Sequence, residues 1–235
     1  MLTSDSCWMK DTCTKASNKN FEAPCLSSNI FCIKLFKLNF LFNEALVSDT
    51  QRRHVSLRLD ADLRDEQAFT QLLDLQSHIE DFVLHGKNLY LHSLITGNGK
   101  TAWALRLLQS YFNAIWFKTD LKCRGLFINV PRLLLAIKDN YSEYNEYAIA
   151  VRNNVLQADL VVWDEIAVRE LSAHDHEQLL SMINGRIDAG KSNIYTSNLP
   201  PDAVKYMLGD RLYSRIVNCS TEIVLYGKDK RSLSK

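Results

Sequence analysis

The sequence lacks a long uninterrupted run of apolar residues. Its longest apolar stretch, around residues 30–42, is broken by Lys34 and Lys37, so it is unsuited to crossing a bilayer. The first ten residues are polar and do not form a basic segment followed by an apolar one, the pattern of a secretory leader. We therefore expect a soluble, cytoplasmic protein with no membrane partner.

The chain also lacks an excess of charge of either sign. Its 235 residues include 28 Lys and Arg and 27 Asp and Glu, which gives a formal net charge of +1. A strongly basic balance, which would by itself indicate nucleic-acid binding, is absent, so any DNA contact must be a local patch. With 46% apolar residues, the chain can bury the core of one ordinary domain plus a smaller appendage.

No internal repeat or low-complexity run is found, but the pattern changes along the chain. From His85 onward, short apolar segments alternate with helical ones, which is typical of a mostly parallel sheet with helices on its faces. We predict five strands, at residues 89–92, 126–130, 160–163, 193–196 and 222–226. Helices are predicted between them at residues 101–112, 131–138, 147–156, 175–189 and 201–208.

The N-terminal part has a different character. Residues 1–50 are rich in cysteine and then aromatic, and we expect a small separate module there, followed at 51–84 by a charged linker and a helix from Glu66 to Leu84. Clustered thiols of a cytosolic chain bind metal more often than they form disulfides. The spacing is looser than in a standard zinc ribbon, so a zinc site and free or buried thiols both stay open for Cys7, Cys13, Cys25 and Cys32.

A phosphate-binding loop is predicted directly after the first strand. Gly97, Asn98, Gly99, Lys100 and Thr101 precede an amphipathic helix. Glycines let backbone N–H groups curl around phosphate, the lysine reaches the β- and γ-phosphates, and the threonine hydroxyl ligates Mg²⁺ at the helix N-terminus. The alternative is a plain glycine turn between a strand and a helix.

One departure from the full loop pattern is evident. The motif G-x-x-x-x-G-K-[ST] has a glycine where this chain has Leu94. That glycine eases the turn out of the strand, whereas the later residues face the phosphates. We therefore expect nucleotide binding with an altered loop geometry.

Acidic residues follow the third predicted strand. Four apolar residues precede Asp164 and Glu165, as in a Walker B motif. An aspartate there holds Mg²⁺, and the adjacent glutamate orients and deprotonates the attacking water. Paired acids also occur simply where a chain leaves the core, but the phosphate loop favours the functional interpretation.

Three further residues are candidates with open alternatives. Asn198 follows the fourth strand and suits either a sensor of the γ-phosphate or a turn. Arg215, four residues after Arg211, suits either a guanidinium delivered to a neighbouring subunit's nucleotide or a solvated helix face. Arg231 suits either a contact with nucleotide in the same subunit or a basic tail.

Taken in order, these segments resemble the bacterial and phage helicase loaders of the DnaC/DnaI type, a branch of the AAA+ ATPases related to IstB-like transposition helpers. The resemblance covers about residues 85–232. It rests on four segments, of which the last is the most family-specific: Gly97–Thr101, Val161–Glu165, Tyr195–Asn198 and Gly209–Arg215.

The resemblance implies a fold class and a set of site residues. The fold would be α/β, a P-loop NTPase (AAA+) three-layer sandwich at residues 85–235, with a five-stranded mostly parallel sheet and a small Cys-rich N-terminal module. Asn198 would be sensor 1, Arg215 the arginine finger acting across a subunit interface, and Arg231 a sensor 2 candidate. ATP and Mg²⁺ would be the cofactors, with zinc in the N-terminal module, as in DnaI-like loaders.

The resemblance also implies a function. The chain would be a self-assembling ATPase of low intrinsic rate that binds the replicative hexameric helicase and single-stranded DNA, from a phage-borne branch. Two rivals remain: a phage adaptor or inhibitor of helicase loading with little turnover, and an IstB-like transposase helper. The intact Glu165 weighs against the first, and the neutral charge weighs against the second.

Overall fold

The computed structural model describes residues 32–52, 63–118, 120–139 and 144–230. Its centre is a five-stranded sheet in the order β2-β3-β4-β1-β5, in which every strand pair is parallel. The strands are β1 (Asn88–His92), β2 (Gly125–Asn129), β3 (Leu160–Asp164), β4 (Ser192–Ser197) and β5 (Thr221–Val224). All five lie at the predicted places, so the α/β prediction is confirmed.

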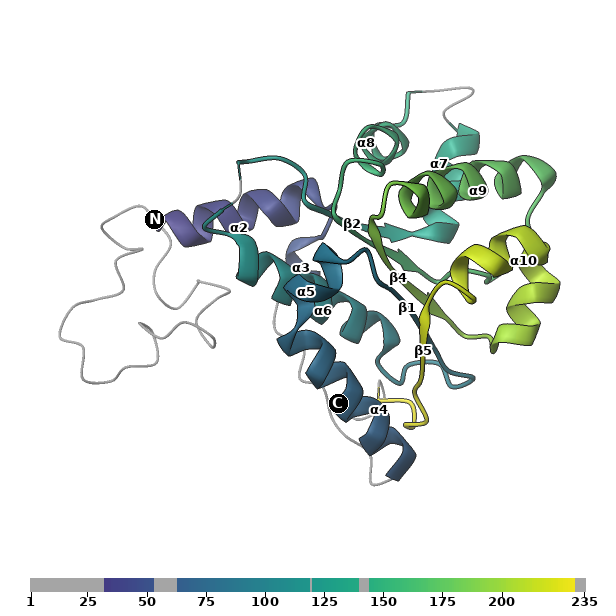
Figure 1. Ribbon diagram of the computed structural model, residues 1–235. Coiled ribbons are helices and arrows are strands. Elements are labelled where there is room, and N and C mark those ends of the chain that lie inside the picture. Colours follow the sequence, from purple (N-terminus) through teal and green to yellow (C-terminus); the bar gives the residue numbers. More distant parts are fainter. Residues whose placement is uncertain (1–31, 53–62, 119, 140–143, 231–235) are drawn as a thin grey trace.

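Helices cover both faces of the sheet and make three layers (Figure 1). One face packs against α2 (Ile33–Glu44), α4 (Leu63–Ser77), α5 (Ile79–Leu84) and α6 (Lys100–Ile115). The helices on the other face are α7 (Val130–Asp139), α8 (Glu146–Asn154), α9 (Ala173–Asp188) and α10 (Pro201–Ile216). Leu89 and Leu91 of β1 belong to the first cluster and Tyr90 to the second, as expected because successive strand side chains point to opposite faces.

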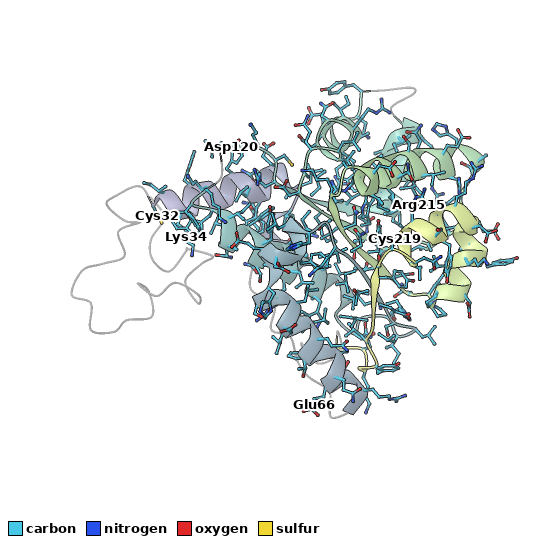
Figure 2. All side chains as sticks on the ribbon, viewed as in Figure 1. Cys32, Lys34, Glu66, Asp120, Arg215 and Cys219 are labelled. Atoms are coloured by element: carbon cyan, nitrogen blue, oxygen red, sulfur yellow. The ribbon has the colours of Figure 1, made fainter. Side chains whose placement is uncertain are left out.

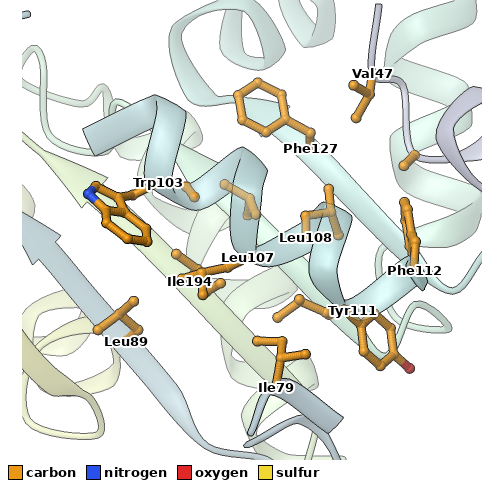
Figure 3. Close-up of a cluster of buried hydrophobic side chains, with 14 of the residues drawn as sticks. Val47, Ile79, Leu89, Trp103, Leu107, Leu108, Tyr111, Phe112, Phe127 and Ile194 are labelled. Atoms are coloured by element: carbon orange, nitrogen blue, oxygen red, sulfur yellow. The ribbon is translucent and has the colours of Figure 1, made fainter. Parts of the chain in front are cut away.

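Helix α6 lies directly on the sheet (Figure 3). Trp103, Leu107 and Phe112 are almost fully buried along it. The approach to β2 is close at Gly125, where an added Cβ would come within 2.9 Å of Leu108 and Phe112 atoms. This packing holds α6, which begins directly after the phosphate loop, against the sheet.

The described part of the predicted N-terminal module packs against the sheet domain. Leu38, Leu41 and Phe42 of α2 are buried in the same cluster as α6, and the Phe42 and Phe112 rings meet edge to face at 5.2 Å. The backbone N–H of Phe127 also donates to the Ala45 carbonyl at 2.8 Å. Residues 32–47 are therefore part of the main core, which corrects the expectation of a separate module over this stretch. The short helix α3 (Asp49–Arg52) follows.

Two helices differ from their predicted form. The helix expected over residues 66–84 is split into α4 and α5 at His78, whose φ of −110° and ψ of 25° are not helical. The Ser77 hydroxyl and the His78 ring both contact the Asp74 carbonyl there. The helix expected to end at residue 208 continues to Ile216, with a kink at Gly209, whose φ of 75° and ψ of 166° suit glycine alone.

A buried arginine joins the helices of one face to the strands. Arg186 of α9 is fully buried, and its guanidinium donates to the carbonyls of Val155, Ala158 and Ser192 and to the Asn193 side chain. Burial lowers the pKa of Arg186 to about 10, so the group stays charged at neutral pH.

The predicted zinc ligands fall mostly outside the described ranges. Cys7, Cys13 and Cys25 lie there, and Cys32 caps α2 by accepting the Leu35 N–H at 3.5 Å. Among the residues that the structure describes, no group of three or more His, Cys, Asp or Glu could hold a metal ion. Within the same residues, no helix is long and apolar enough to span a membrane.

Candidate nucleotide site

The phosphate loop connects β1 to α6 at the carboxyl edge of the sheet, the usual ligand-binding edge of parallel α/β folds. Gly97 and Gly99 have φ values of 73° and 108°, a left-handed region that glycine adopts readily. Gly99 is the N-cap of α6, with no side chain to bond the first helical N–H groups. Those N–H groups are free of a capping side chain and can bind an anion.

Polar contacts inside the loop set its shape. Asn98 is buried, and its amide donates to the Ser93 hydroxyl at 2.6 Å and the Leu225 carbonyl at 3.2 Å. The Ile95 N–H donates to the same hydroxyl at 3.1 Å. Asn98 therefore supports the loop from inside, while Leu94, at the position of the missing glycine, is 76% exposed.

Lys100 is held beneath the loop. Its ammonium donates to the Ile95 carbonyl at 2.9 Å and to Asn98 Oδ1 at 3.2 Å. The side chain is thus positioned by the loop itself, and it brings one positive charge to the place where the motif requires it.

Thr101 and Asp164 meet across the site. Thr101 Oγ1 donates to Asp164 Oδ1 at 2.9 Å, and Thr196 Oγ1 of β4 donates to the same oxygen at 2.7 Å. Asp164 is 4% exposed, and burial raises the pKa of its carboxyl although both hydroxyls oppose the rise. The hydroxyl oxygen of Thr101 and the carboxylate oxygens of Asp164 are ligands that suit Mg²⁺, a hard cation.

Glu165 directly follows β3 and has an unusual backbone conformation. Its φ is 58°, uncommon for a residue other than glycine, and its N–H donates to Thr196 Oγ1 at 3.0 Å. Asn129, at the end of β2, donates to Glu165 Oε2 at 3.1 Å. The carboxylate is therefore held by a neighbouring strand, next to Thr101 and Asp164.

Sequence reasoning missed Thr196 and Asn129. Both stand at predicted strand ends, so the available signal was a polar side chain at the carboxyl edge. Asn198, the predicted sensor, lies beyond the end of β4 and lines a shallow pocket with Leu199, Ala203 and Tyr206. Thr196, rather than Asn198, contacts Asp164 in this structure.

The predicted arginine finger lies on another part of the molecule. Arg215 follows the kink in α10 (Figure 2), and its Nε donates to Asn184 Oδ1 at 2.6 Å. Arg211 and Arg215 line a groove between α9 and α10. No phosphate-loop residue lines that groove. Arg231 lies outside the described residues.

The structure is similar to solved structures of replication proteins. A DnaC helicase loader matches with a TM-score of 0.56 and 19% identity, covering 72% of this chain and 96% of that one. DnaI matches with a TM-score of 0.56 and 18% identity, covering 75% and 88%. AMPPCP-bound DnaA from Aquifex aeolicus matches with a TM-score of 0.54 and 16% identity, covering 74% of this chain and 51% of that one.

These likenesses define the class of fold. At such identities they show that the chain shares the α/β fold of the DnaC helicase loader, DnaI and DnaA, and they confirm at the level of fold the resemblance to DnaC and DnaI. No protein-family model matches the sequence. The search of curated proteins likewise found no match.

Proposed function

We propose that the chain is an ATP-dependent loader of the replicative hexameric helicase. The observation that carries the proposal is the assembly of Lys100, Thr101 and Asp164 at one edge of a fold shared with the DnaC helicase loader and DnaI. The nucleotide would bind on the loop with Mg²⁺ held by Thr101 and Asp164, and the metal would supply charge neutralisation at the phosphates. AMPPCP-bound DnaA is a nucleotide complex of the same fold.

The residues of this chain would divide the work. Lys100 and the N–H groups at the start of α6 bind and orient the phosphates. Glu165 orients the attacking water and accepts its proton, and Asn129 keeps that carboxylate in place. Within the described ranges, no arginine is hydrogen-bonded or ion-paired to Asp164 or Glu165, whose partners are Thr101, Thr196 and Asn129. This supports the proposal of a low intrinsic rate that Arg215 of a neighbouring subunit raises.

The proposed partners are the helicase, single-stranded DNA and further copies of this chain. We place the helicase contact in the N-terminal part, residues 1–50, and zinc there stays a prediction. The test is co-purification with candidate replicative helicases, with and without ATP, using the wild-type chain and Lys100→Ala. Loss of ATP-dependent loading in the variant supports the proposal, and unchanged ATP binding and loading contradict it.

A turnover measurement with helicase and single-stranded DNA separates the proposal from its nearest rival. Hydrolysis should rise when both are present and should vanish in Glu165→Gln, whose amide cannot accept a proton. Tight binding to the helicase without stimulated hydrolysis would instead favour an adaptor or inhibitor of loading. Lys205→Ala, on the exposed face of α10, is the control for Lys100→Ala. It also removes one lysine, and it should bind ATP and hydrolyse it as the wild type does.

A further inference from the structure

The segment after β5 lies across the phosphate loop. The Leu225 N–H donates to the His92 carbonyl at 2.9 Å, and the Leu225 carbonyl accepts from the Asn98 amide at 3.2 Å. Further along, the Lys230 N–H donates to the Gly97 carbonyl at 3.0 Å. Residues 225–230, which we call the strap, are therefore attached to the loop region at both ends.

The strap is also attached to α4. The Gly227 N–H donates at 3.1 Å to Asp65, whose carboxylate is buried, and the Lys230 ammonium lies 3.8 Å from the same carboxylate. The Arg64 guanidinium lies 4.6 Å from the centre of the Tyr226 ring. These contacts hold the strap at the side of the loop, between it and the start of α4.

Asp229 brings a negative charge directly onto the phosphate loop. A Cβ added to Gly97 would lie 2.1 Å from Asp229 Oδ1 and 2.5 Å from its Cγ, so the carboxylate fills the space over this glycine. The loop is built to receive phosphate, and a carboxylate repels a polyphosphate at short range. The Asp229 carboxylate and a bound nucleotide would therefore repel each other at the loop.

We propose that the strap is an acidic latch, with Asp229 resting on the phosphate loop without nucleotide and displaced from it by a nucleoside polyphosphate. This inference rests on the proposed nucleotide site. Displacement of the carboxylate would break the Lys230–Gly97 hydrogen bond and free the end of the strap from α4. Nucleotide binding would thereby change the contacts of Asp65 at the start of α4.

Titration with a fluorescent ATP analogue tests the latch. Asp229→Asn should bind the analogue roughly three- to tenfold more tightly than the wild type, and the gain should shrink as salt is raised. Asp229→Ala should gain at least as much. Asp188→Asn is the matched control, because it removes the same charge from the exposed end of α9 at the opposite edge of the sheet; its affinity should not change.

The measured affinities have three possible outcomes, which test the latch and the nucleotide site separately. Equal affinity in the wild type and both Asp229 variants overturns the latch and leaves the nucleotide site intact. Absence of binding in the wild type and in both variants overturns the nucleotide site as well. Tighter binding by the variants supports both.

Hydrogen exchange supplies the second readout. The Gly227 and Lys230 amides are hydrogen-bonded in this structure, so the latch predicts faster exchange of residues 225–230 when a non-hydrolysable ATP analogue is added. Slower exchange would mean that the strap closes over the nucleotide, and it would overturn the proposal.

Discussion

At the scale of single residues, the buried carboxyl of Asp164, which we propose as a magnesium ligand, is held at a cost to stability. Burial raises the pKa of Asp164, so the folded state disfavours the charged form that the proposed metal binding requires. Asp164→Asn keeps an oxygen for Thr101 and Thr196 and removes that penalty. We expect it to abolish turnover and to raise the free energy of unfolding at neutral pH by about 0.5–2 kcal/mol.

The pH dependence of this gain follows from the sign of the shift. Below the ordinary aspartate pKa of about 4, the carboxyl is protonated in both states, so the variant should gain nothing from the lost charge. As pH rises from about 4 toward the raised pKa, the wild type loses stability, because over this range the unfolded state has given up the proton and the folded state still holds it. Urea unfolding of both proteins from pH 3.5 to 7.5 measures the difference, and a gain that is constant with pH would contradict this account.

Asn129 and Asn145 allow a matched test of the contact to Glu165. Each caps a helix by accepting a backbone N–H, from Arg132 and Ala148 respectively, but only Asn129 also donates to Glu165. Both alanine variants should lose about 1 kcal/mol of stability with the cap. Only Asn129→Ala should lower the rate of ATP hydrolysis, by about tenfold, at unchanged nucleotide affinity.

Steady-state kinetics and denaturant unfolding of the two variants decide the matter. Equal hydrolysis rates in both would mean that the Asn129–Glu165 hydrogen bond has no part in the reaction. A stability loss in Asn129→Ala alone would mean that the two caps are not equivalent, and the comparison of rates would then need correction for folding.

The site residues differ in how far the sequence reveals them. Lys100, Thr101, Asp164 and Glu165 sit in motifs whose spacing along the chain reflects their chemistry, and the structure brings Thr101 and Asp164 into contact. Asn129 belongs to no motif, and Thr196 lies in the Tyr195–Asn198 segment but was not singled out there. Their role depends on which strands are neighbours, and strand order is not written in the local pattern.

At the scale of elements, the hydrogen bonds of Arg186 connect α9 to the end of α8 and to the starts of β3 and β4. Arg186→Met keeps much of the volume but leaves several buried carbonyls without a donor. We expect a loss of about 3 kcal/mol or more in the free energy of unfolding.

The control for this prediction is Arg152→Met, on the exposed face of α8, where the change should stay within about 0.5 kcal/mol. Urea unfolding monitored by circular dichroism measures both. A loss of similar size in the two variants would show that Arg186 contributes no more than an exposed arginine.

The elements themselves were largely predictable, because apolar runs and helical periodicity come from local sequence. Two helices differ from their predicted form at single residues that helical periodicity does not mark. His78 interrupts a helix without any glycine or proline, and Gly209 bends one that continues for another turn and more. The burial of α2 depended on a distant surface formed by α6, which no local pattern describes.

At the scale of the whole molecule, the two halves of the proposed active site lie on different surfaces. Glu165 is at the carboxyl edge of the sheet, whereas Arg215 lies in the groove between α9 and α10. If the two act across a subunit interface, Glu165→Gln and Arg215→Ala should each be inactive alone.

Mixing the two variants should then restore hydrolysis, because some interfaces combine an intact Glu165 with an intact Arg215. The measurement is ATP turnover as a function of the mixing ratio, with helicase and single-stranded DNA present. No recovery at any ratio would place the role of Arg215 within its own subunit, or outside the reaction.

The burial of α2 in the main core also bears on how the protein can be divided. A fragment that begins at residue 51 would expose Phe112 and Phe127, which pack against Phe42 and Ala45, and we expect it to aggregate or to unfold at a lower temperature than the full chain. If helicase recognition resides in residues 1–50 and ATP turnover in the sheet domain, cutting the chain near residue 50 would not give two intact parts. Helix α2 precedes that cut but packs in the core of the sheet domain.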